Sequence, residues 1–134
     1  MRSLIVVLAA AVPLLTGCSG GGAPAEDLAT EDLRDAVAAT FQSRCIGCHG
    51  SDAPSSGLSL AEDDMESSLI NSWSYVNEGF VLVKPGKPDE SLLIKILRGD
   101  HEAGGLHMPP NGIMGDAEID LIYQWIESLG EEGT

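Results

Sequence analysis

Five consecutive residues, Cys45-Ile46-Gly47-Cys48-His49, combine two thiols and an imidazole at fixed spacing. Thiols at this spacing can add across the two vinyl groups of a haem, and the histidine that follows can then bind the iron. The pattern therefore predicts one covalently bound haem c, held by Cys45 and Cys48, with His49 as an axial ligand. A Cys45–Cys48 disulfide is the alternative, since disulfides persist outside the cytoplasm, but it would leave His49 without a role.

A second candidate for the iron lies in a glycine-containing loop predicted over residues 100–115. Met108 stands there before two prolines, which restrain the backbone and so fix the approach of the thioether. A methionine ligand raises the reduction potential relative to histidine. We therefore predict Met108 as the sixth ligand, with Met114, His107 and His101 as its rivals; ligation by two histidines would lower the potential.

The haem motif must be presented by the helix that precedes it. Acidic residues follow Thr30, which suits a helix that begins there with Thr30 as its N-cap. Leu33, Val37 and Phe41 recur every four residues and form one apolar stripe. The spacing predicts a helix that runs into Cys45.

The rest of the chain is predicted to be helices joined by loops, which makes the fold all-α with about four helices. The expected elements are a loop over 50–57, a weaker helix over 60–73, an ambiguous segment over 75–83 in which 80–83 could be a strand, a turn over 84–88, a helix over 90–98 capped by Asp89 and ended by Gly99, and a last helix capped by Asp116 and closed by Gly130.

The N-terminus predicts export and a lipid anchor. Arg2 is followed by an apolar run that ends at Cys18, and that run is too short to span a bilayer comfortably. The residues just before Cys18 resemble a bacterial lipobox, in which cleavage exposes a lipid-bearing cysteine. We therefore expect a lipoprotein signal peptide over 1–17 and a flexible tether over 18–29. The domain itself is expected over 30–130; an ordinary signal or an uncleaved anchor is the alternative for the N-terminus.

The charge of the chain excludes some partners. Without Arg2, six basic residues face 21 acidic ones, a formal charge of −15. Nucleic acid and anionic lipid both need basic patches, so neither is an expected partner. Four of the six basic residues lie between Lys84 and Arg98, which fits either a dipole that orients a docking partner or a solvated acidic surface.

Segments 41–50, 57–60, 84–94 and 108–110, with Trp125-Ile126 near the end, follow one another in the order of a known family. On these motifs the chain resembles a class I-type cytochrome c domain, particularly the planctomycete form. The resemblance implies a small cytochrome c fold in which the first and last helices cross beside the haem. Phe41 would then pack against Trp125 or Ile122, in a structural role.

Residues 61–83 depart from the family pattern, so the partners of the haem propionates stay open among Tyr75, Trp73 and Arg98. We expect a lipid-anchored, extracytoplasmic monohaem cytochrome that passes single electrons between redox partner proteins and is not an enzyme. A haem-based ligand sensor or weak peroxidase, and a structural haem subunit of a larger assembly, are the alternatives.

Overall fold

The computed structural model describes residues 30–100 and 106–130. The predicted signal peptide, the tether with Cys18, and His101 lie outside these residues. The domain boundaries at 30 and 130 stay predictions.

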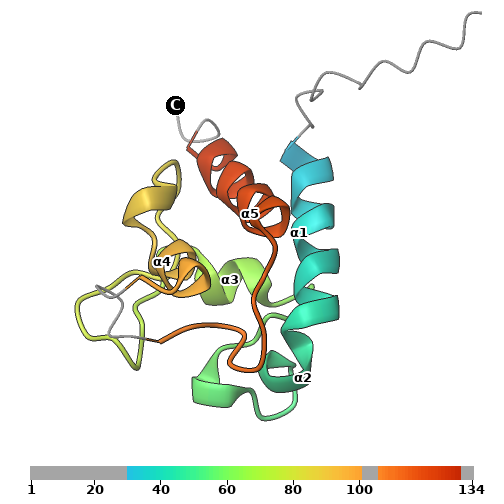
Figure 1. Cartoon of the computed structure of the whole chain (residues 1–134), viewed down its shortest axis with the longest axis vertical. Coiled ribbons are helices and arrows are strands. Elements are labelled where there is room, and N and C mark those ends of the chain that lie inside the picture. The colour runs from blue at the N-terminus through green and yellow to red at the C-terminus, as the bar shows by residue number, and fades with distance from the viewer. Residues whose placement is uncertain (1–29, 101–105, 131–134) are drawn as a thin grey trace, which may run out of the picture.

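The described chain is helical, as the sequence predicts. Five α-helices follow one another in the described residues, with a 3₁₀ turn before α3 and another before α4 (Figure 1). They are α1 (Thr30–Arg44), α2 (Ile46–His49), α3 (Met65–Leu69), α4 (Leu92–Arg98) and α5 (Asp116–Ser128), with the 3₁₀ turns η1 (Ser55–Gly57) and η2 (Pro88–Glu90).

The first and last helices pack against each other (Figure 1), and they contribute eight of the sixteen buried residues of the hydrophobic cluster. The stripe of Leu33, Val37 and Phe41 on α1 is buried in one hydrophobic cluster with α5. From α5 that cluster receives Trp125 and Ile122, so the packing that the resemblance implied is present. Burial of these apolar faces is what holds two otherwise marginal helices together.

Several predicted helix ends differ from those in the structure. Thr30 is itself helical in α1, and Asp116 is the first residue of α5 with Gly115 at its N-cap. The prediction that Asp89 caps the fourth helix is wrong, because Asp89 lies in the 3₁₀ turn η2 and Ser91 occupies the N-cap. Gly99 ends that helix as predicted, with φ of 70° in the left-handed region.

The helix predicted over 60–73 is reduced to α3. Ile70 is extended and Asn71 has φ of 56°, so the helical path ends after Leu69. The chain then turns back on itself through isolated bridges between Ile70 and Val83 and between Trp73 and Val81. No strand forms in the described residues, including the segment 80–83.

The turn over 84–87 docks on the end of α5. The Gly86 N–H donates to the Ile126 carbonyl at 2.8 Å. A Cβ on Gly130 would lie 2.6 Å from the Gly86 Cα, so the two backbones meet where only glycine fits. Within the described residues, no helix is long and apolar enough to cross a membrane.

Candidate functional site

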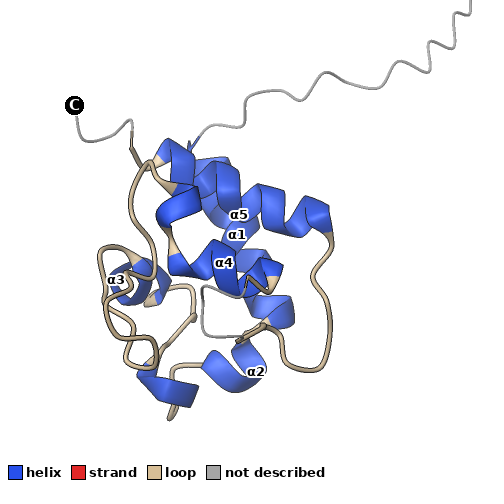
Figure 2. Ribbon diagram, turned by 60° about the vertical axis from the view of Figure 1, so that its left-hand side comes forward, coloured by secondary structure: helices blue, strands red, loops and turns tan. Residues whose placement is uncertain are grey.

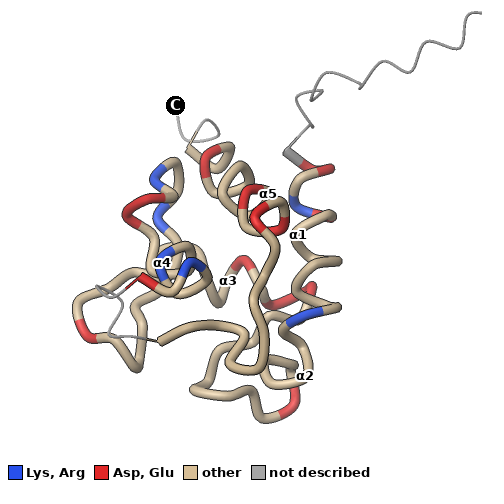
Figure 3. The backbone as a smooth tube through the Cα atoms, in the orientation of Figure 1, with Lys and Arg blue, Asp and Glu red and all other residues tan. Residues whose placement is uncertain are grey.

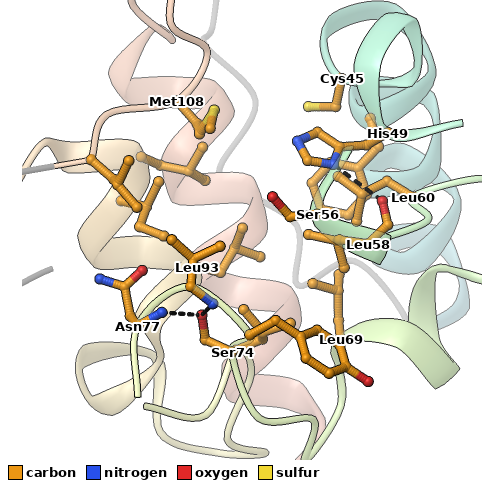
Figure 4. Close-up of a pocket in the computed structure, with 17 residues that line it drawn as sticks. Cys45, His49, Ser56, Leu58, Leu60, Leu69, Ser74, Asn77, Leu93 and Met108 are labelled. Carbon is orange, nitrogen blue, oxygen red and sulfur yellow. Dashed lines mark hydrogen bonds between the residues drawn. The ribbon is translucent and has the colours of Figure 1, made fainter. Parts of the chain in front are cut away.

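An apolar pocket opens between α2 on one side and α4 with the loop before α5 on the other (Figure 4). Its empty volume, open mouth included, is about 820 Å³, within the range of cofactor sites. The motif residues Cys45 and His49 lie on one wall, and Met108 lies across from them (Figure 4). Apolar side chains fill in the surface between them: Phe41, Leu58, Leu60, Leu69, Leu82, Leu93, Ile96, Leu97 and Leu106.

His49 is held in a defined orientation. Its Nδ1 lies 3.1 Å from the Leu58 carbonyl oxygen, and its own carbonyl accepts the Leu60 N–H at 2.7 Å (Figure 4). A ring that donates its Nδ1 proton to a backbone carbonyl keeps the lone pair on Nε2. Metal-binding histidines are oriented in this way by a partner of the second ring nitrogen. Leu58 therefore supplies, through its backbone, a function that no side-chain motif could reveal.

The two thiols have different surroundings. Cys45 is half-buried in the pocket, and burial raises the pKa of its thiol; nearby Arg44 lowers it and Glu118 raises it further. Cys48 is exposed and lines a separate surface hollow beside α2. Both are free thiols in this structure, not joined to each other. The pocket thus has the Cys45 thiol on its wall, whereas Cys48, whose N–H donates to the Cys45 carbonyl at 3.1 Å, lines the neighbouring hollow.

Met108 reaches the pocket from a loop that is tied to α4. Its N–H donates to the Ile96 carbonyl at 3.3 Å, and its side chain is half-buried on the pocket wall. Its rivals are placed elsewhere. Met114 is buried in the hydrophobic core, and the His107 ring lies so close to Gly99 that a Cβ there would be 2.9 Å from it. Neither lines the pocket, and His101 is outside the described residues.

The pocket ends in polar groups at the side distant from Cys45. Ser74 and Asn77 lie there with Tyr75, and the Ser74 Oγ accepts the Asn77 N–H at 2.9 Å (Figure 4). Tyr75 is one of the residues predicted as a propionate partner, whereas Ser74 and Asn77 were not predicted; the Ser-x-x-Asn turn pattern was the available signal for them. Trp73 lines a neighbouring hollow instead.

Arg98 is engaged away from the pocket. Its guanidinium lies 3.7 Å from Asp89 and stacks over the Tyr123 ring at 5.2 Å from the ring centre. It is not among the residues that line the pocket. The propionate role considered for Arg98 therefore has no support from its position.

The residues present fit a haem. A flat apolar body can lie between the two walls, with an imidazole nitrogen on one face and a thioether on the other, which is a ligand pair used by cytochromes c. The Cys45 thiol lies near one end of the pocket and hydroxyl and amide groups lie at the other (Figure 4). This matches the macrocycle, whose vinyl and propionate groups lie on opposite edges.

The sequence profile of the planctomycete cytochrome C family matches residues 45–112, and the chain belongs to this family. A cytochrome c family implies an electron carrier with covalent haem c and redox partners, typically non-enzymatic and extracytoplasmic. No curated protein and no solved structure matches the chain.

Proposed function

We propose that this protein is a lipid-anchored monohaem cytochrome that carries single electrons outside the cytoplasm. In this proposal Cys45 and Cys48 hold the haem, and His49 and Met108 are the axial ligands. The observation that supports it most is the His49 ring, fixed through Nδ1 by the Leu58 carbonyl and facing Met108 across an apolar pocket.

When bound, haem c supplies a one-electron couple between ferric and ferrous iron. The residues of this chain would attach the haem, bind its iron and limit the access of water to it. α2 carries Cys48 and His49, and Cys45 is its N-cap residue, so attachment and ligation would share one short segment. The hydrogen bonds of His49 and of the Met108 backbone hold the two ligands in place from opposite walls. The apolar side chains between them limit access of water, which together with the Met ligand favours a raised potential.

The lipid anchor is proposed on Cys18 and would keep the haem domain near its membrane through the tether over 18–29. A Cys18→Ser chain should no longer incorporate labelled palmitate and should lose the lipid-dependent membrane association of the wild type. Equal labelling of the two chains would contradict the anchor while leaving the haem proposal intact.

The haem proposal is tested on a chain from Ser19 to Thr134, secreted with haem-maturation machinery. Among the residues that the structure describes, every buried core residue lies between Leu33 and Ile126, so this chain keeps all of them. We expect a covalent c-type spectrum with a charge-transfer band from methionine sulfur to iron. Met108→Leu should remove that band, whereas the matched change Met114→Leu should retain it.

Other outcomes assign the site differently. A high-spin spectrum with rapid CO binding would favour the ligand sensor or weak peroxidase. Loss of the band in Met114→Leu would identify Met114, and not Met108, as the sixth ligand. A stoichiometric partner without electron transfer to soluble acceptors would favour a structural haem subunit. Absence of covalent haem would contradict the proposal.

A further inference from the structure

A segment beside the pocket exposes large apolar side chains. In residues 70–83, which we call the aromatic hairpin, Trp73 is 65% exposed, Tyr75 87% and Val76 58%. This hairpin lies at the outer edge of the domain (Figure 1). Scattered exposed apolar residues are ordinary, but three within four residues form a patch.

The backbone conformation of the aromatic hairpin is fixed by hydrogen bonds. The Ser74 N–H donates to the Phe80 carbonyl at 2.9 Å, and the Leu82 N–H donates to the Ser72 carbonyl at 2.8 Å. The Ser74 Oγ also accepts the backbone N–H groups of Val76 and Asn77. A hairpin fixed by its own hydrogen bonds presents its aromatic side chains with little entropy left to lose on binding.

The patch is continuous with the haem pocket. Tyr75 lines both that pocket and a shallow hollow next to it, whereas Trp73 lines only the hollow. A haem in the pocket would therefore leave Trp73 uncovered. Besides Leu58 and Leu82, the hollow is lined by serine and asparagine residues, so it also offers hydrogen-bonding groups: Ser67, Ser68, Asn71, Ser72 and Ser74.

The charge around the patch limits which kind of molecule could bind there. Glu78 is the only charged residue of the aromatic hairpin, which is seen as a largely uncharged loop in Figure 3. The chain as a whole is strongly acidic, with a formal charge of −14. The next bases, Lys84 and Lys87, both pair with Glu90. Mutual repulsion disfavours a second copy, and the acidic surface disfavours anionic lipid.

We propose that the aromatic hairpin is the docking surface for a redox partner protein with an apolar centre and a basic margin, and that Trp73 is its anchor. This inference rests on the proposed function, because it places the partner beside the pocket that would hold the haem. Buried aromatic anchors carry much of the affinity of such interfaces, and opposite charge around them guides approach.

The test uses the Ser19–Thr134 chain and a gold electrode that carries a mixed monolayer of methyl- and amine-terminated alkanethiols. The protein concentration that gives half of the maximal electroactive coverage measures affinity. Trp73→Ser should raise it about tenfold, as expected for loss of one anchor, and Trp73→Phe should retain most of the affinity. Ile113→Ser is the matched control, because Ile113 is 81% exposed but lines neither the haem pocket nor the hollow. All three variants should keep the wild-type spectrum and midpoint potential.

An unchanged affinity in Trp73→Ser would overturn the docking surface alone, as would equal wild-type affinity for a monolayer of amine groups only. Trp73-dependent binding to phosphatidylcholine vesicles would assign the patch to a membrane. A dimer in sedimentation that Trp73→Ser dissociates would assign it to a second copy. A chain without covalent haem would give no current and would overturn the proposed function as well.

Discussion

The helix pair α1 and α5 and the loops that connect the other helices (tan in Figure 2) are held in place by different interactions. The helix pair is held by side chains buried in one cluster, including Phe41 and Trp125. The loops over 50–64, 70–91 and 106–115 place only Leu60, Val83 and Met114 among the buried residues of that cluster, and they also form many hydrogen bonds between backbone groups or between side chains and backbone. Apolar packing tolerates little loss of volume, whereas a loop can exchange one side chain with little effect on the fold.

This difference implies that the residues that stabilise the fold and the residues that would bind the haem lie in largely different parts of the molecule. Of the candidate site residues, Cys48 and His49 belong to α2 and Cys45 joins α1 to α2, whereas Met108 stands in a loop. We therefore expect changes in the helix pair to act on folding, and changes in the loops to act on the site at nearly constant stability.

The largest effect is expected for Trp125→Ala. Trp125 is fully buried between the helices, so truncation should cost about 3–5 kcal/mol of unfolding free energy through lost contacts and a cavity. Its indole N–H has no hydrogen-bond partner among the described residues. Trp125→Phe should therefore cost clearly less, because it breaks no hydrogen bond. Urea unfolding of the haem-loaded protein measures both losses; equal losses would show that the N–H has a role we have not identified.

The crossed helices could be predicted from the sequence because their signal is local and repeated. Leu33, Val37 and Phe41 define a face on their own, and the spacing of apolar residues in the last helix does the same. The haem motif is equally local. The helix over 60–73 was overestimated, because its end depends on the left-handed conformation of Asn71, which periodicity does not report.

The hydrogen bonds that hold the candidate ligands His49 and Met108 in place were harder to predict. The contact between His49 and the Leu58 carbonyl uses a backbone atom, so no residue type at position 58 could have indicated it. The same holds for the Met108 N–H, which is bound by the backbone of Ile96. Met114 looked like a rival to Met108 in a loop, yet it is buried in the core; burial depends on the path of the chain and not on the local sequence.

The second effect is expected in the loops, for Met108→His. Exchange of a thioether for an imidazole should lower the midpoint potential by a sizeable part of the roughly 0.8 V that axial ligation can span. The unfolding free energy should change much less than in Trp125→Ala, because Met108 is only half-buried on the pocket wall. Spectroelectrochemical titration measures the potential, with Met114→Leu as the control. An unchanged potential would mean that Met108 does not bind the iron.

A smaller effect is expected where the two regions meet. Glu118 on α5 accepts the Gly115 N–H at 2.9 Å and binds Arg44 of α1 through both carboxylate oxygens, at 2.8 and 3.1 Å. The backbone hydrogen bond first, and Arg44 second, lower the pKa of Glu118. Because the folded value lies below the ordinary one of about 4.3, the contribution to stability is complete above that value and is lost as pH falls through the folded pKa.

Glu118→Gln should therefore melt below the wild type at pH 7, and the gap in Tm should close in strongly acidic buffer. Asp120→Asn, a change at an exposed carboxylate on the same helix, is the matched control. Thermal unfolding across this pH range gives the comparison. A gap that stays constant down to low pH would show that the charge of Glu118 contributes nothing.

The smallest effect is expected at Tyr123, where α5 meets the turn before α4. The Tyr123 hydroxyl donates to the Asp89 carboxylate at 3.0 Å, and this hydrogen bond is the main cause that raises the pKa of the phenol. Asp89→Asn should lower that pKa toward its ordinary value of about 10. The stabilisation by this bond should be complete below the ordinary value and should be lost as pH rises through the raised one, because the phenolate cannot donate. Absorption titration of a Tyr75→Phe chain, in which Tyr123 is the only tyrosine left, follows this phenol alone. If Asp89→Asn left its pKa unchanged, the Tyr123–Asp89 contact would not persist in solution, and this corner would be held by the docking of Gly86 on α5 instead.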